Sequence, residues 1–374
     1  MKTGSLRTAL LFGVSLVMLL PSSAFSWWNT GHEIVAQLAE DHLTVTAKAN
    51  LKTVLAVDVE YPGNLKLSRL SDTLVTCAPW ADTIKQETDW YTSTQENFFS
   101  SLHFIDVLIP QNAVPSMEAS EQNFQATILH NPVGNVDYAI KSAIKVLAST
   151  DNDPVLKAVA FRFLVHFVGD IHQPFHSSDP VLDGKITHGG NLVPLNTPPY
   201  FPGEKNQYST EISGKEYNEA DEIHAFWDAT GGAFKQLTDP TYAAISKEDL
   251  AYIKQTASSL DTRYAGAYDS EIDNPNVDAW AVESHYDASK AYTTDILDPR
   301  FVNREDKFYI NNNLAYEQFA ASISEVRVYL AGRRLGNLLN TLFDPDGVVP
   351  SYDKYLQGIL TDPAVYNIYT FSNW

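Results

Sequence analysis

The sequence predicts a single, mainly α-helical domain with a small β-hairpin excursion. Apolar residues recur at helical spacing along most of the chain, and 44% of the residues are hydrophobic, which is enough for a large core. The segment 177–213 differs, because it is rich in Gly, Pro, Thr and Asn, and we expect a long loop or a small hairpin there. We divide the chain into a leader (1–26), a main domain (27–343) and a C-terminal extension (344–374).

The first 26 residues are typical of a secretory signal peptide. Lys2 and Arg7 give a basic start, and residues 9–20 form an apolar run too short to span a membrane. Ala24 and Ser26 place small residues at the two positions that a signal peptidase reads. We therefore expect cleavage after Ser26 and a secreted or periplasmic protein without a stable membrane anchor.

Cleavage after Ser26 would make Trp27 the N-terminal residue. A free amine and the carbonyl of the same residue can chelate a metal ion, and His32 lies five residues further on. The sequence therefore predicts that the N-terminus contributes to a metal site.

Seven helices follow from the apolar spacing. The helix that begins at Pro154 is strongly apolar, so we expect it to be central, and Pro174 should end it. Asp-Pro-Asp-Gly after Phe343 ends the last helix, and we expect an irregular, Tyr-rich tail beyond it. The predicted ranges are 31–54, 136–148, 154–168, 216–227, 247–264, 277–292 and 313–342.

Charge and cysteine content narrow the class of protein. A net charge of −20 argues against a nucleic-acid partner, because proteins usually bind phosphate groups through Lys and Arg. This argument does not hold if bound metal cations set the electric field at the site. The chain has one cysteine, Cys77, which excludes an intramolecular disulfide and which we expect to be a buried small hydrophobe. The fold must then be stabilised by its core and by any metal ions it binds.

Histidine and aspartate residues recur in groups whose spacing suits metal binding. His166 and Asp170 are four residues apart, on one face of the central helix, and His224 and Asp228 repeat that spacing. Imidazole and carboxylate ligands without thiolates suit Zn²⁺. The other candidates in these groups are Asp82, His103 and His176.

Several motifs carry a resemblance to a known family. They are Trp-xxxx-His at the predicted N-terminus, Trp-Ala-Asp, Leu-His-Phe-Ile-Asp, His-Phe-Val-Gly-Asp-Ile-His-Gln-Pro-Phe-His, Gly-Gly-Asn and His-xx-Trp-Asp. In these motifs and their order, the chain from Trp27 to about Leu342 resembles the zinc-dependent, single-strand-specific nucleases and 3′-nucleotidases of the S1/P1 type. That family shares its helical fold with bacterial zinc phospholipases C.

The resemblance implies three zinc ions per chain. The first would be bound by Asp82, His103, His166 and Asp170. The second would be bound by Trp27 and His32, with Asp170 as a bridge. The third would be bound by His176, His224 and Asp228.

The resemblance also implies roles for four further residues. Lys85 would assist with phosphate charge, and Asp106 would orient the attacking water or bind the base. Phe104 and Asn191 would lie near the bound nucleotide. The implied activity is hydrolysis of single-stranded RNA or DNA to 5′-nucleotides and release of phosphate from 3′-nucleotides, by a protein that we expect to be monomeric.

Two alternatives remain open at this point. A zinc phospholipase C could use the same scaffold, although its last carboxylate ligand is typically Glu and here it is Asp228. A secreted metal-binding protein without catalysis is the other alternative, although a structural zinc usually has no open coordination position.

The unpaired Cys77 departs from the eukaryotic members of the family, which are usually disulfide-bonded, and favours a bacterial type.

Overall fold

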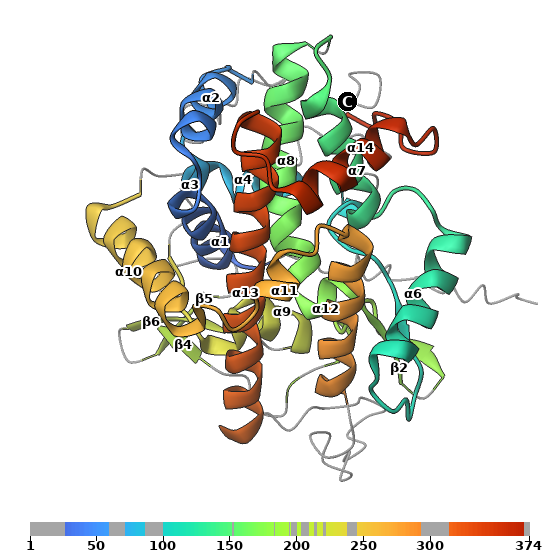
Figure 1. Cartoon of the computed structure of the whole chain (residues 1–374). Helices are drawn as coiled ribbons and strands as arrows, with labels where there is room; N and C mark the ends of the chain where they lie inside the picture. Colours follow the sequence, from blue (N-terminus) through green and yellow to red (C-terminus); the bar gives the residue numbers. More distant parts are fainter. Residues whose placement is uncertain are drawn as a thin grey trace, which may run out of the picture.

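The computed structural model is mainly helical (Figure 1). It describes residues 27–59, 72–86, 100–151, 153–182, 184–193, 195, 200–202, 209–212, 215–219, 222–237, 245–292 and 314–369. The helices are α1 (Asn29–Asp41), α2 (Val45–Leu55), α3 (Leu74–Cys77), α4 (Trp80–Gln86), α6 (Met117–His130), α7 (Val136–Ala148), α8 (Pro154–His172), α9 (Ile223–Asp228), α10 (Lys247–Tyr264), α11 (Asp269–Ile272), α12 (Val277–Ala291), α13 (Leu314–Phe343) and α14 (Pro350–Thr361). Among these residues no helix combines the length and the apolar character that a membrane span needs.

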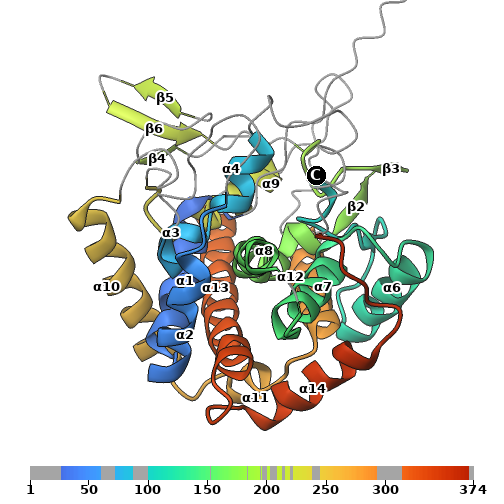
Figure 2. The same cartoon turned by 90° about the horizontal axis from the view of Figure 1, so that it is seen from above.

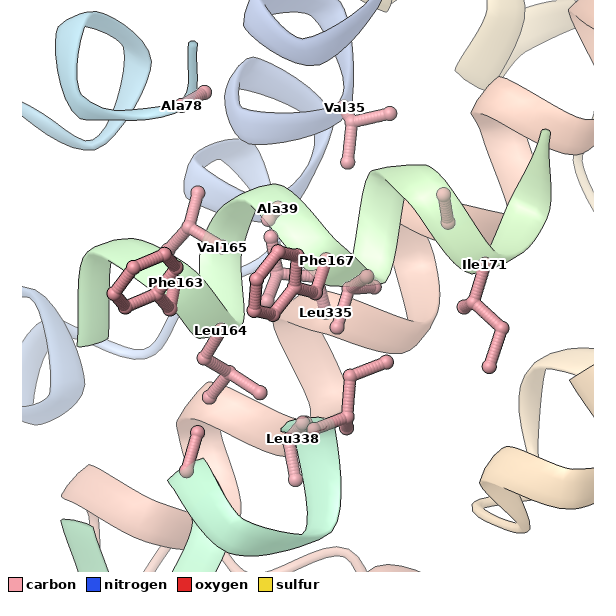
Figure 3. Close-up of a cluster of buried hydrophobic side chains, with 14 of the residues drawn as sticks. Val35, Ala39, Ala78, Phe163, Leu164, Val165, Phe167, Ile171, Leu335 and Leu338 are labelled. Atoms are coloured by element: carbon pink, nitrogen blue, oxygen red, sulfur yellow. The ribbon is translucent and has the colours of Figure 1, made fainter. Parts of the chain in front are cut away.

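Helix α8 lies at the centre of the molecule. Figure 2 views α8 end on, with α1, α13, α12 and α7 around it. Because neighbours cover it on all sides, its residues from Ala158 to His172 are buried. Its aromatic and aliphatic side chains pack with those of α1 and α13, and Figure 3 labels Val35, Ala39, Ala78, Phe163, Leu164, Val165, Phe167, Ile171, Leu335 and Leu338.

Two small sheets lie in the described chain. In the first, β1 (Leu108–Ile109) pairs in parallel with β2 (Asp179–Leu182), which pairs antiparallel with β3 (Lys185–Ile186). The second has the antiparallel order β4 (Tyr200–Pro202), β6 (Lys215–Glu219), β5 (Ser209–Ile212). The predicted hairpin excursion is therefore confirmed. The β1–β2 pairing also brings the chain after His103 alongside the chain after His176.

Three sequence-based expectations about helices were wrong. The predicted helix 31–54 is two helices, because Thr44 caps α2 by accepting a hydrogen bond from the amide of Ala47. Residues 215–219 form β6 rather than the start of a helix, since pairing with β4 and β5 outweighs the local pattern. The tail is not irregular throughout, because α14 occupies residues 350–361 and buries Tyr352, Leu356 and Ile359 on one face.

A buried ion-pair network joins α8, α12 and α13. Glu283 accepts hydrogen bonds from Arg334 at 2.8 Å and from Arg327 at 2.9 Å. Arg327 also donates to the carbonyl of His172, and Arg334 donates to His172 Nε2 at 2.9 Å. The network therefore anchors the C-terminal end of α8.

Gly332 should be required where α1 and α13 pack closely. A Cβ at this position would lie 2.4 Å from Leu38 Cβ and 3.0 Å from the carbonyl of Val35. We expect Gly332→Ala to lower the free energy of unfolding by about 1–3 kcal/mol through overpacking. Gly358→Ala is the control: a Cβ there meets nothing within 4 Å, so the change should stabilise α14 by about 0.5–1 kcal/mol. Urea unfolding measures the free energy of unfolding of both variants. Equal changes in Gly332→Ala and Gly358→Ala would contradict a close α1–α13 contact at Gly332.

The Glu283 network should make stability depend on acid pH. Burial opposes the charged carboxylate, but the two guanidinium groups outweigh burial and hold the pKa of Glu283 below its ordinary 4.5. A folded-state pKa below the unfolded one stabilises the protein above about pH 4.5, and this contribution is lost as pH falls through the folded pKa. Glu283→Gln should cost about 3–5 kcal/mol at pH 7 and flatten the acid limb of the stability curve. The surface change Glu121→Gln should do neither, and an unchanged acid limb in Glu283→Gln would refute the assignment.

Candidate metal centre

The C-terminal half of α8 carries two polar side chains into the core. His166 and Asp170 are buried, and His166 Nε2 lies 3.3 Å from Asp170 Oδ2. An ionised carboxylate in an apolar interior is costly unless cations or hydrogen bonds compensate for the lost water. The neighbouring segments supply that compensation.

The first group gathers around His166. Asp82, in the first turn of α4, has Oδ1 3.6 Å from His166 Nε2 and 3.5 Å from His103 Nδ1. His103 Nδ1 is also 3.0 Å from Asp170 Oδ2 and 3.1 Å from His166 Nε2. The four side chains predicted for the first metal therefore meet in one buried place.

The second group forms on the other side of Asp170. His32 Nε2, from α1, lies 3.4 Å from Asp170 Oδ1, and its ring stacks on His166 with the ring centroids 4.0 Å apart. Gly169 permits this approach, because a Cβ there would lie 2.5 Å from His32 Nδ1. Trp27 is buried beside the group, and its indole Nε1 donates to the carbonyl of Gly169 at 2.9 Å.

The third group lies between the short 3₁₀ helix Pro174–Ser177 and α9. Asp228 Oδ1 is 3.6 Å from His176 Nε2, and Asp228 Oδ2 is 3.5 Å from His224 Nε2. Gln173 lies in the long histidine motif but was not among the predicted site residues. Its side chain donates to Asp228 Oδ1 at 2.6 Å. The amide of Trp28 donates to the Asp228 carbonyl at 2.8 Å, which ties the N-terminal segment to this group.

Backbone carbonyls fix the orientation of three imidazoles. Nδ1 of His166 lies 2.7 Å from the carbonyl of Ala78, and Nδ1 of His176 lies 2.7 Å from that of His103. Nδ1 of His224 likewise lies 2.8 Å from the carbonyl of Gly189. Since a carbonyl only accepts, each Nδ1 carries a proton, and each Nε2 is the nitrogen that faces the carboxylates. This is the orientation in which histidine binds a metal ion.

The charges at the centre favour an added cation. Burial opposes protonation of His166, but Asp170 and Asp82 outweigh it and raise its pKa to about 10. Burial and the charge on His166 lower the pKa of His32 to about 4. The carboxylates thus stabilise a positive charge on His166. A divalent ion, which displaces protons from its ligands, fits the same donors.

The described residues therefore contain three buried His and Asp groups that could hold metal ions. The groups are His32, His166 and Asp170; Asp82, His103 and His166; and His176, His224 and Asp228. In the geometry His166 as well as Asp170 lies between the first two groups, whereas the resemblance implied that Asp170 is shared. Donors of this kind, without thiolates, suit Zn²⁺.

The accessory candidates lie in the chain after His103, in α4 and in the turn that contains Asn191. Phe104 is half-buried next to His103, and Asp106 is exposed three residues further on. Lys85 lies in α4, one turn after Asp82, but its side chain is outside the described residues.

Asn191 lies in the turn that follows Gly189 and Gly190. Its Nδ2 donates to the carbonyl of His188 at 2.6 Å. Both glycines have positive φ, +65° and +96°, which lets the Gly189 carbonyl reach His224. The turn therefore supports the third group.

The remaining histidines lie outside the three groups. His42 contacts Asp261 at 2.9 Å, His130 bonds within its own helix, and His285 contacts Ser120 and the carbonyl of Leu108. His172 donates through Nδ1 to the carbonyl of Val168 and accepts from Arg334, away from His166 and Asp170. Cys77 is buried, as expected.

Comparison with known proteins agrees with this arrangement. Residues 27–344 match the family described as S1/P1 Nuclease. Nuclease S1 of Aspergillus oryzae is 24% identical over 316 residues, which cover 81% of this chain and 90% of that protein. Endonuclease 1 of Arabidopsis thaliana is 29% identical over 51% of this chain and 55% of its own length, and Nuclease P1 of Penicillium citrinum is 26% identical over 50% and 59%.

The family match covers every residue of the three groups and most of the chain. Together with the buried His and Asp geometry, it means that this chain belongs to the S1/P1 nuclease family of hydrolases.

Proposed function

We propose that the protein is a secreted phosphodiesterase with three zinc ions, which hydrolyses single-stranded RNA and DNA to 5′-nucleotides and removes phosphate from 3′-nucleotides. The observation that carries this proposal is the meeting of three His and Asp groups around one buried end of α8. Asp170 contacts donors of both neighbouring groups, with Oδ1 toward His32 and Oδ2 toward His103 and His166.

The proposal assigns the ligands as the resemblance implied. Asp82, His103, His166 and Asp170 hold the first ion. Trp27, His32 and Asp170 hold the second. His176, His224 and Asp228 hold the third. Zinc bound there would supply Lewis acidity, which activates water near neutral pH and stabilises negative charge on phosphate oxygens.

The other residues bind and orient the substrate in this proposal. Lys85 adds positive charge for the phosphate, and Asp106 at the exposed rim orients water or binds the base. Phe104 offers a ring for an unpaired base to stack on, which favours single strands. Asn191 lies on the turn beside His224 and contacts the nucleotide.

A substrate panel tests the proposal directly. Protein beginning at Trp27 is assayed on single-stranded RNA and DNA, duplex DNA, 3′-AMP and phosphatidylcholine, with zinc and with chelator. We expect zinc-dependent release of 5′-nucleotides from single strands and of phosphate from 3′-AMP. Asp170→Asn should lower kcat/KM by at least about 100-fold and reduce the zinc content, because it removes a ligand of two groups.

The surface variant Asp269→Asn is the matched control and should keep both activity and metal. Lipid headgroup release with inert nucleic acid would transfer the assignment to a phospholipase C. Inactivity on every substrate by protein that contains three zinc ions would favour a binding protein without catalysis.

The proposed role of the Trp27 amine can be tested separately from the activity. We propose that the leader is removed after Ser26, so that the amine of Trp27 becomes a ligand. Intact-mass analysis of exported protein should give a chain that begins at Trp27. A form that carries one extra alanine before Trp27 should bind about one zinc ion fewer, because its amine is displaced by one residue. Full zinc content in that form would contradict an N-terminal ligand.

A further inference from the structure

The chain beyond residue 344, where the family match ends, is built into the fold. After α14 it runs along α7, and side chains of α7 bind its backbone. The hydroxyl of Tyr138 accepts from the amide of Tyr366 at 2.9 Å. The hydroxyl of Ser142 donates to the carbonyl of Tyr366 at 2.9 Å and accepts from the amide of Ile368 at 3.1 Å. These bonds fix the path of the chain toward the core.

Tyr369 follows directly and places its ring inside the core. The side chain is fully buried, and its hydroxyl donates to the carbonyl of Ala139 at 2.9 Å. The ring stacks on Phe163 of α8, with the ring centroids 5.2 Å apart and 27° between the ring planes. A residue outside the family match therefore contacts the central helix.

Phe163 connects the Tyr369 ring to two elements of the first group. It stacks on Phe167, one helical turn further along α8, with the centroids 5.1 Å apart and 24° between the planes. Figure 3 shows these two rings side by side on α8. Phe163 also meets Trp80 edge to face, with the centroids 5.3 Å apart. Trp80 is the first residue of α4, two residues before Asp82.

Phe167 in turn contacts His103, a predicted ligand of the first ion. The two rings meet edge to face, with the centroids 5.0 Å apart and 85° between the planes. His103 directs Nδ1 at Asp170 Oδ2, 3.0 Å away. Because Phe167 packs against the imidazole, the position of Phe167 limits how that imidazole can turn. The rings of Phe163 and Phe167 thus join Tyr369 to His103.

We propose that Tyr369 is a positioning residue for the metal centre: it holds the rings of Phe163 and Phe167 in place and thereby fixes the His103 imidazole in the first group. Close-packed interiors transmit displacements, because their side chains have little free space. Without the Tyr369 ring, Phe163 gains space to move and Phe167 loses its support. The proposal rests on the metal binding of the proposed function, but it does not depend on the substrate.

Zinc affinity tests the proposal without any substrate. The zinc content of each protein is measured at equilibrium over a series of zinc buffers. Asp82→Asn, which removes a ligand of the first group alone, identifies the binding step of the first ion. We expect Tyr369→Leu to weaken that step at least about fivefold and to leave the other steps unchanged. Tyr369→Phe keeps the ring and loses only the hydroxyl, so its zinc affinity should equal that of the wild type.

Tyr352→Leu is the matched control for lost stability. Tyr352 is also fully buried in the chain beyond residue 344, and its hydroxyl donates to the carbonyl of Ile272 at 2.7 Å. It is not one of the rings that join Tyr369 to His103. We expect Tyr352→Leu to lower the Tm of the metal-free protein about as much as Tyr369→Leu does, and to leave all zinc affinities unchanged.

Two further variants complete the test. Phe163→Leu should also weaken the first ion, and combining it with Tyr369→Leu should add little, because both changes act through one contact. Tyr369→Met retains a buried apolar side chain without a ring, and it takes the place of Tyr369→Leu if that variant does not fold. Wild-type affinity for the first ion in the folded variant without the ring, or an equal loss in Tyr352→Leu, would overturn the proposal and leave the proposed function intact. A wild-type protein that binds no zinc would overturn both.

Discussion

The burial of one carboxylate, Asp170, in the central helix is the constraint on which much of this structure depends. An ionised group there must be surrounded by donors or cations, and no single element can supply them. His166 comes from the same helix, His32 from α1 and His103 from the chain before β1. The electrostatic requirement of one side chain therefore specifies how three parts of the chain meet.

The surrounding architecture holds these groups in place by contacts that need no metal. Backbone carbonyls of Ala78, His103 and Gly189 accept from the outer nitrogens of three histidines, and so set the direction of the inner ones. The far face of α8 is anchored separately through His172, Arg327 and Arg334. One face of α8 thus contacts a buried ion-pair network, and the opposite face carries oriented His and Asp side chains.

Sequence reasoning succeeded where the chemistry is local. The i, i+4 spacing of His166 and Asp170 on an apolar helix predicted a buried polar face, and Pro174 marked its end to within two residues. The turn after Gln173 brings His176 close to His224, and this turn depends on tertiary contacts. Spacing along the sequence therefore could not place His176 with His224 and Asp228, and only the family resemblance did so. The supporting role of Gln173 was missed for the same reason. The strand at 215–219 was mistaken for helix because its partners lie elsewhere in the chain. Helix α14 was not predicted although Tyr352, Leu356 and Ile359 repeat at helical spacing, because its twelve residues include a Pro, a Gly and two Tyr residues, which favour helix weakly.

The packing of α1 against α13 has a consequence for how the chain folds. These helices begin at residues 29 and 314, so a major core contact joins the two ends of the main domain. Contacts of such large sequence separation slow folding, because loop-closure entropy is lost before the contact forms. A growing chain that lacks α13 can pack α1 only against α3, α8 and α10, and the most extensive contact of α1 is still missing. The full packing around the three His and Asp groups is therefore complete only after nearly the whole chain has been synthesised, and any metal ion that these groups hold would enter a finished fold late in the life of each molecule.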